Sequence, residues 1–295
     1  MRSPFVHLMV AAALSSTLIV AACESSSTGG TQPTPKENTE DKPKVDSPPE
    51  ALKGDPIWLK PRAVVGRSVR TTRTLYSTEV TPDGRKLTQS SKETYVQKTN
   101  LADALGQATS VTRFYEQSQV RVESPGHEPV VEVNAREGAT VEIKQSESRV
   151  LTEVLAGSPS SDELQRMLIT GFDVGLLPLQ AVRLGQRWTI DIKRNPGLND
   201  ISRAFGVNAS KNELSAMLYS HEAGISKISI EWEVQGTIGE GTPLVIQLVG
   251  NMELDHTSGL ITKLELGGGK TDSEGKVIPQ IAIEIVREEL KAWYD

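Results

Sequence analysis

The chain has very little of the side-chain chemistry on which most enzyme sites depend. It contains one cysteine and four histidines in 295 residues, and only 4% of its residues are aromatic. A single cysteine excludes an intrachain disulfide and a thiolate zinc site. His-Glu-x-x-His and Gly-x-Ser-x-Gly patterns are also absent. We therefore expect no metal site, no cofactor and no catalytic residues, and predict that the protein is not an enzyme. A hydrolase with an unrecognised site is the weakest alternative.

Two short segments come closest to ligand-binding motifs. His256 follows Glu253 and Asp255, but strand alternation puts the two carboxylates on one face and the histidine on the other, which argues against a metal site. Gly267–Lys270 lacks the spacing of a phosphate-binding loop, and we expect it to be a flexible turn at the end of a strand.

The charge balance is acidic. The formal net charge is −6, and it becomes −7 without residues 1–22, because Arg2 is the only charged side chain there. An acidic surface repels phosphate backbones and anionic headgroups. We therefore expect no nucleic-acid partner.

The amino terminus has the layout of a secretion signal. Arg2 precedes a run of apolar and small residues, 5–22, which ends at Cys23. The segment Val20–Cys23 (Val-Ala-Ala-Cys) closely resembles the lipobox of bacterial lipoproteins. This resemblance implies cleavage before Cys23, with lipid on its sulfur and on the new amino terminus.

A transmembrane anchor is the alternative for residues 5–22. Eighteen residues can just span a bilayer, but three hydroxyl side chains and five alanines make this run weakly apolar. We therefore expect a protein anchored in the cell envelope by lipid on Cys23. In lipoproteins of the enteric type, a residue other than Asp after the cysteine, here Glu24, implies the outer rather than the inner membrane.

Composition divides the chain into three parts. Residues 1–22 are the expected signal peptide, and residues 23–54 are an expected lipidated, disordered tether, rich in Ser, Thr, Pro, Lys and Glu. The tether serves either as a leash or as a neutral spacer. Residues 55–295 are the expected β-rich domain, with a candidate sub-boundary near 195–208.

Period-two alternation, interrupted by Gly and Pro turns, predicts a mainly β fold. We expect one or more large curved antiparallel sheets with one or two short helices; a half-barrel, as in the periplasmic lipoprotein carriers, is one form this could take. In Ile225–Ile238, alternate residues from Ile228 to Val234 are apolar and their neighbours polar. The expected strands are 69–80, 85–97, 109–122, 130–133, 139–144, 213–221, 225–238, 243–254, 260–266 and 279–293, with a turn at 81–84.

Few segments favour helix. Ser160–Glu163 forms a capping box, and apolar spacing then predicts a helix up to Gly171. A second short helix is expected over 200–205. Residues 213–221 fit either a helix or a strand, and we favour the strand because Ala223-Gly224 leads directly into the next strand.

One segment resembles a signature of an uncharacterised family of secreted bacterial β-rich domains. In that family Leu-Pro is followed by Val-x-x-Gly-x-x-Trp; here these residues are Leu177, Pro178, Val182, Gly185 and Trp188. The similarity spans roughly residues 66–266 and includes 111–115, 139–144 and 252–260. The resemblance implies a β-rich secreted domain and no particular chemistry.

Trp188 begins an expected strand, 188–192, that places Trp188, Ile190 and Ile192 inward. We expect the indole to be a core anchor, whose truncation costs about 3–5 kcal/mol of stability. The alternative is an exposed platform on which a ring or sugar stacks.

These features favour a non-enzymatic interaction or assembly module of the cell envelope, bound to the membrane by lipid on Cys23. Its partner is an envelope protein that this sequence does not identify. A carrier or binder of a lipid or other apolar ligand in a curved sheet is the alternative. The polar outer face of 225–234 favours a single dry core over a ligand cleft.

Overall fold

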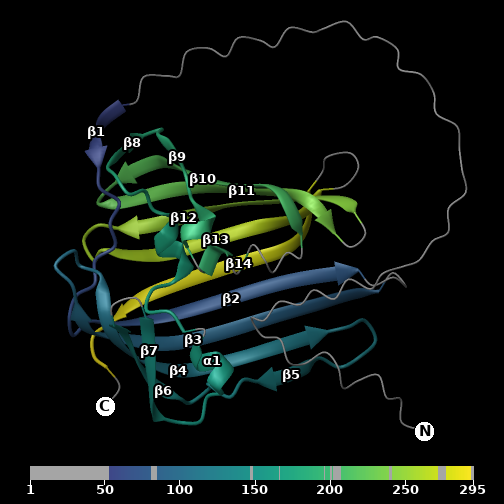
Figure 1. Cartoon of the computed structure of the whole chain (residues 1–295), viewed down its shortest axis with the longest axis horizontal. Coiled ribbons are helices and arrows are strands. Elements are labelled where there is room, and N and C mark those ends of the chain that lie inside the picture. The colour runs from purple at the N-terminus through teal and green to yellow at the C-terminus, as the bar shows by residue number, and fades with distance from the viewer. Residues whose placement is uncertain are drawn as a thin grey trace, which may run out of the picture.

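One large antiparallel sheet organises the chain (Figure 1). Its 12 strands run in the order β7-β6-β4-β3-β2-β14-β13-β12-β11-β10-β9, and β5 pairs with β4. The computed structural model describes residues 53–80, 85–146, 149–165, 167–195, 197–199, 201, 207–238, 241–271 and 277–293. Cys23, the signal peptide, the tether up to residue 52 and the turn at 81–84 lie outside the described residues.

Most of the strands are longer than the average for globular proteins. They are β2 (Ser68–Val80), β3 (Lys86–Ala102), β4 (Ala108–Glu123), β5 (Val130–Val133), β6 (Thr140–Ser146), β7 (Arg149–Ala156), β9 (Arg187–Thr189), β10 (Asn208–Glu222), β11 (Ile225–Ile238), β12 (Thr242–Asp255), β13 (Leu260–Thr271) and β14 (Val277–Leu290). A separate pair joins β1 (Lys53–Ile57) to β8 (Val182–Leu184). The prediction of a mainly β protein with a large antiparallel sheet is confirmed.

Alternation sets the two faces of the sheet, as expected. In β11, Ile228, Ile230, Trp232 and Val234 are buried, and they define what we call the inner face. The polar residues between them lie on the outer face. β10 is a strand rather than a helix and pairs with β11 along its length.

The glycine run in β13 is a strand, so the predicted flexible turn at Gly267–Lys270 is wrong. A side chain at Gly268 would place its Cβ 1.9 Å from the backbone oxygen of Gln247 in β12. The register between β13 and β14 shifts at Gly268/Gly269. Glycine is therefore needed here because the backbone of the neighbouring strand approaches closely at an irregularity in the sheet.

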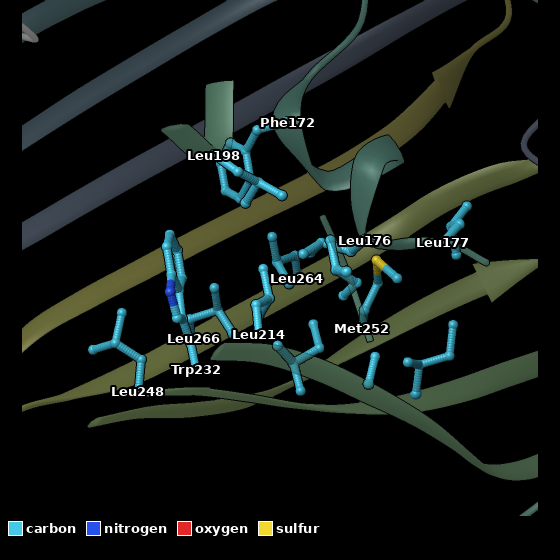
Figure 2. Close-up of a cluster of buried hydrophobic side chains, with 14 of the residues drawn as sticks. Phe172, Leu176, Leu177, Leu198, Leu214, Trp232, Leu248, Met252, Leu264 and Leu266 are labelled. Carbon is cyan, nitrogen blue, oxygen red and sulfur yellow. The ribbon is translucent and has the colours of Figure 1, made fainter. Parts of the chain in front are cut away.

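A covering segment, the described residues of 161–201, lies across the inner face. It carries α1 (Ser161–Gln165), η1 (Phe172–Leu176), β8, β9 and η2 (Ile192–Arg194). Figure 2 shows its side chains packed onto those of β10–β13. The contact joins Phe172, Leu176, Leu177 and Leu198 of the covering segment to Leu214, Trp232, Leu248, Met252, Leu264 and Leu266 of the sheet.

A second, smaller core lies beneath the other end of the covering segment. Met167 and Ile169 pack there against Tyr115, Val141 and Ile143 from β4 and β6. Each fully buried apolar side chain contributes about 1.5–3 kcal/mol relative to exposure. The covering segment therefore stabilises both halves of the sheet.

The predicted capping box is present, but its helix is short. The backbone N–H of Glu163 donates to Ser160 Oγ at 3.3 Å, and the Glu163 carboxylate accepts from the Ser160 N–H at 2.8 Å. α1 ends at Gln165 rather than at Gly171, because Met167 and Ile169 enter the smaller core in an irregular conformation. Residues 197–199 and 201 are helical, whereas 200 and 202–206, most of the second predicted helix, lie outside the described residues.

Candidate functional site

The inner face, where a curved sheet would hold an apolar ligand, is filled by the chain itself. Phe172, Leu176 and Leu198 of the covering segment are almost fully buried against the sheet. Two open hollows, with volumes of about 390 and 360 Å³, lie elsewhere on the surface. They lie against surface residues around Leu105 and around His221.

An ion pair fixes the covering segment to the sheet. Asp173 in η1 has no exposed surface, and its Oδ1 accepts from Arg287 Nη2 of β14 at 3.0 Å. Arg287 Nη1 also donates to the backbone oxygen of Ile261 at 3.2 Å. Burial alone would lower the pKa of Arg287, but Asp173 more than compensates and the pKa is raised. The Arg287 guanidinium therefore stays charged.

A second buried cation fixes the other half of the covering segment. Arg113 of β4 lies 4.4 Å from the ring centroid of Tyr95 and donates to Gln97 Oε1. It also donates to the backbone oxygen of Leu168 at 3.0 Å. Burial alone would lower the pKa of Arg113, but Tyr115 and its other partners raise it. This cation is held by structural partners, so it is not available to an anionic ligand.

Trp188 is a structural anchor and not an exposed ring on which a ligand could stack. It is partly buried against the main core, and its Nε1 donates to the backbone oxygen of Leu176 at 2.9 Å. The strand that contains it ends at Thr189, not at residue 192 as expected, although Ile190 and Ile192 are buried. The fully buried tryptophan is Trp232. A tight turn at Gly185, with φ of +80°, precedes the strand of Trp188.

His256 does not share a site with Glu253 and Asp255 but lies in a cluster with other residues. His256 Nε2 lies 2.8 Å from Ser226 Oγ, which lies 2.9 Å from His221 Nδ1. Burial and His221 lower the pKa of His256. Asp255 binds Thr257 and Ser258 instead, and Glu253 lies near Lys227. Sequence reasoning missed this cluster, because His221 meets His256 only through the β10–β11–β12 register.

This histidine cluster provides neither a metal site nor a nucleophile. Among the described residues, no group of three or more His, Cys, Asp or Glu side chains is placed to hold a metal ion. Ser226 is fully buried between the two imidazoles, so its hydroxyl is inaccessible to a substrate. The cluster ties the β10–β11 turn to the end of β12.

The outer face of β9–β12 is polar. Arg187 pairs with Glu231 at 2.7 Å, and Lys211 pairs with Glu233 at 2.8 Å. These solvent-accessible pairs contribute little stability individually, but they keep this face hydrated. Val249 is an apolar exception, 60% exposed in the middle of β12.

A group of exposed apolar side chains lies at one end of the sheet. We call this end, which consists of β5 and β7, the free edge. Seven large apolar side chains there are 38–58% exposed: Val130, Val131, Val133, Val150, Leu151, Val154 and Leu155. β7 pairs with β6, and no strand adjoins its other side in the described part of the chain. At the opposite end, β9 has only three residues. Natural sheets usually shorten or charge their edges, so a long apolar edge is a candidate binding surface.

Sequence reasoning missed β7. Residues 150–155 read Val-Leu-Thr-Glu-Val-Leu, in which apolar residues occur on both faces of the strand. The expected signal of a half-buried strand, one apolar face and one polar face, is therefore weak. Two apolar faces on a strand are typical of burial on both sides, which β7 lacks here.

Comparisons with known proteins do not identify a family. No protein-family profile and no curated protein matches the chain. One similar solved structure is described as lipid-protein interactions in lipovitellin; its identity is 12% and its TM-score 0.48. The match covers 79% of this chain and 26% of that one. A similarity at this identity and TM-score establishes neither a family nor a role for the chain. No helix in the described residues is long and apolar enough to cross a membrane.

Proposed function

We propose that this protein is a non-enzymatic cell-envelope lipoprotein, anchored by lipid on Cys23, that binds a protein partner through the free edge of its sheet. The observation that carries the proposal is the exposure of β5 and β7 beside an inner face filled by the covering segment. An open strand edge offers backbone donors and acceptors to an extended segment, and the exposed Val and Leu side chains add apolar contact.

The secretion and anchoring parts of the proposal rest on sequence. The Val20–Cys23 segment supports lipid attachment in the envelope, and Glu24 supports the outer membrane. The Leu177-to-Trp188 signature supports kinship with secreted β-rich domains. A lipid on Cys23 would hold the free edge near other envelope proteins and so raise their effective concentration.

Site-specific photo-crosslinking tests the edge. A photoreactive residue at Leu151 in β7 should capture protein in intact cells. The matched control is Val249, which is similarly exposed (60% against 53%) but lies in a strand paired on both sides. Equal capture from both positions, or none from Leu151, would contradict the proposal.

Native mass spectrometry of the delipidated protein tests the alternative, a carrier of an apolar ligand. Under the proposed function the spectrum contains no co-purified lipid, because Leu176 and Leu198 already occupy the inner face. A stoichiometric lipid adduct would instead require the covering segment to leave the sheet, and would favour the carrier.

A further inference from the structure

We infer that β7 pairs antiparallel with β7 of a second copy of this chain, with Arg149 of each copy opposite Glu153 of the other. This inference deepens the proposed function by naming the partner of β7. It starts from the free side of β7, the exposed apolar residues of this strand and the order of its charged residues.

Both faces of β7 carry exposed apolar side chains, so a partner that buries them must cover both faces. The face shared by Val150 and Val154 is the inner one, where Thr152 Oγ1 reaches the Leu164 backbone oxygen at 3.5 Å. Leu151, 53% exposed, lies on the outer face because side chains alternate along a strand. A further strand added to the sheet covers part of both faces at once, whereas a helix docked on one face does not.

The sequence of β7 is complementary to itself in one register. Two antiparallel copies with the twofold axis at Leu151 place Leu151 opposite itself and Val150 opposite Thr152. The same register places Arg149 opposite Glu153 on both sides of the axis. Opposite charges directly across two strands stabilise their pairing.

Neighbouring registers lose this complementarity. An axis at Thr152 places Arg149 opposite Leu155 and Glu153 opposite Leu151, so both charges face apolar side chains. An axis at Glu153 places the two carboxylates opposite each other, which is repulsive. The axis at Leu151 is therefore the favoured register.

Within one chain, the charged residues of β7 do not face opposite charges in β6. Glu153 lies opposite Glu142 of β6, and Arg149 lies opposite Ser146. Lys144 pairs with Glu142 at 2.8 Å. Arg149 of a second copy would bring another cation to this acidic pair, and an isologous interface makes the same contact twice.

Disulfide crosslinking in membranes tests the register. In the full-length lipidated chain, Leu151→Cys places two thiols opposite each other across the axis, at about 4.5–5.5 Å between Cβ atoms. Oxidation with copper phenanthroline should therefore give a covalent dimer on a non-reducing gel. The matched control is Leu155→Cys, on the same face and equally exposed (52%), whose two copies would be about 27 Å apart. Equal yields, or none at residue 151, overturn the inference.

A charge swap tests the same contact without a covalent bond. Arg149→Glu alone and Glu153→Arg alone should each weaken dimerisation of the detergent-extracted protein by about tenfold, because both contacts become repulsive. Mixing the two variants should restore the dimer, since each cation then faces a carboxylate. The double variant Arg149→Glu/Glu153→Arg should also dimerise. Unchanged dimerisation in the single variants, or no rescue in the mixture, overturns the inference.

The photo-crosslinking at Leu151 separates the two proposals. A product of twice the chain mass supports the dimer. Capture of a different protein, together with no Leu151→Cys dimer, overturns the dimer and leaves the proposed function standing. No capture of any kind, with a folded protein, overturns both.

Discussion

Asp173 in the covering segment and Arg287 in the last strand form a buried ion pair, although they are 114 positions apart in sequence. Asp173 has no exposed surface and Arg287 is 12% exposed. Their contact joins the covering segment, which has little regular secondary structure, to the middle of the sheet. Removal of one partner leaves the other as a buried, uncompensated charge.

Asp173→Asn should therefore destabilise the protein by about 3–5 kcal/mol. The double variant Asp173→Asn/Arg287→Met should lose less, because no buried charge remains. Urea unfolding of the purified chain measures both. The exposed pair Asp191–Arg194 provides the control, since Asp191→Asn should change the stability by no more than about 1 kcal/mol. Equal effects of Asp173→Asn and Asp191→Asn would contradict this assignment.

The two tryptophans of the main core should differ in their contributions. Trp232 is fully buried, so Trp232→Ala should cost about 3–5 kcal/mol of unfolding free energy. Trp188 is partly exposed, so Trp188→Ala should cost less. Trp188→Phe isolates the hydrogen bond to Leu176, worth about 1 kcal/mol. The reverse order of the two alanine variants would restore the prediction from sequence that Trp188 is the core anchor.

Mild acid should destabilise the protein through His256. The pKa of His256 is lowered in the folded state, so the unfolded chain binds its proton first as the pH falls. This stabilisation is complete above the unfolded pKa of about 6.5 and declines as the pH falls below it. Urea midpoints at pH 7.5 and pH 5.5 measure the change. His256→Gln should reduce the difference between the two midpoints; an unchanged difference would assign it to other groups.

Cys23→Ser should release the protein from membranes. The Val20–Cys23 segment predicts lipid attachment at Cys23. Two or more acyl chains hold a protein stably in a membrane, at about 0.8 kcal/mol per buried methylene. Fractionation after a high-salt wash measures it, and Ser25→Ala is a matched neighbouring control. A Cys23→Ser chain that still sediments with washed membranes would place the anchor elsewhere.

Limited proteolysis should leave one resistant fragment that begins near residue 55. β1 begins at Lys53, close to the expected start of the domain. A single fragment is expected because β2 pairs with β14 and one sheet joins both halves of the chain. Two stable fragments split near 195–208 would instead establish two domains.

Most of the elements predicted from sequence are those in which one face meets the core and the other meets water. β11 is the clearest example, since Ile228 to Val234 alternate with polar residues. β7 was missed because its apolar residues occupy both faces. The role of Gly267–Lys270 was also misjudged, since only the approach of Gln247 from β12 reveals why glycine is required there.

The site depends on contacts that local patterns do not carry. The covering segment has few regular elements, so neither a period of two nor a period of 3.6 indicates which face of the sheet it fills. The Asp173–Arg287 pair and the His221–Ser226–His256 cluster each require the long-range register. Trp188 was correctly expected to pack against apolar residues, but its hydrogen bond to Leu176 follows only from the geometry.

The pairing of β2 with β14 also constrains the order in which the protein can fold. Ser77 in the first long strand pairs with Ile281 in the last. During synthesis, the strands from β2 to β7 can form hairpins, as can those from β10 onward, but the two groups cannot join until β14 has been made. Contacts so distant in sequence slow folding and leave strand edges exposed in the meantime. The sheet therefore depends on its last strand, and the loss of β14 would divide it at the centre.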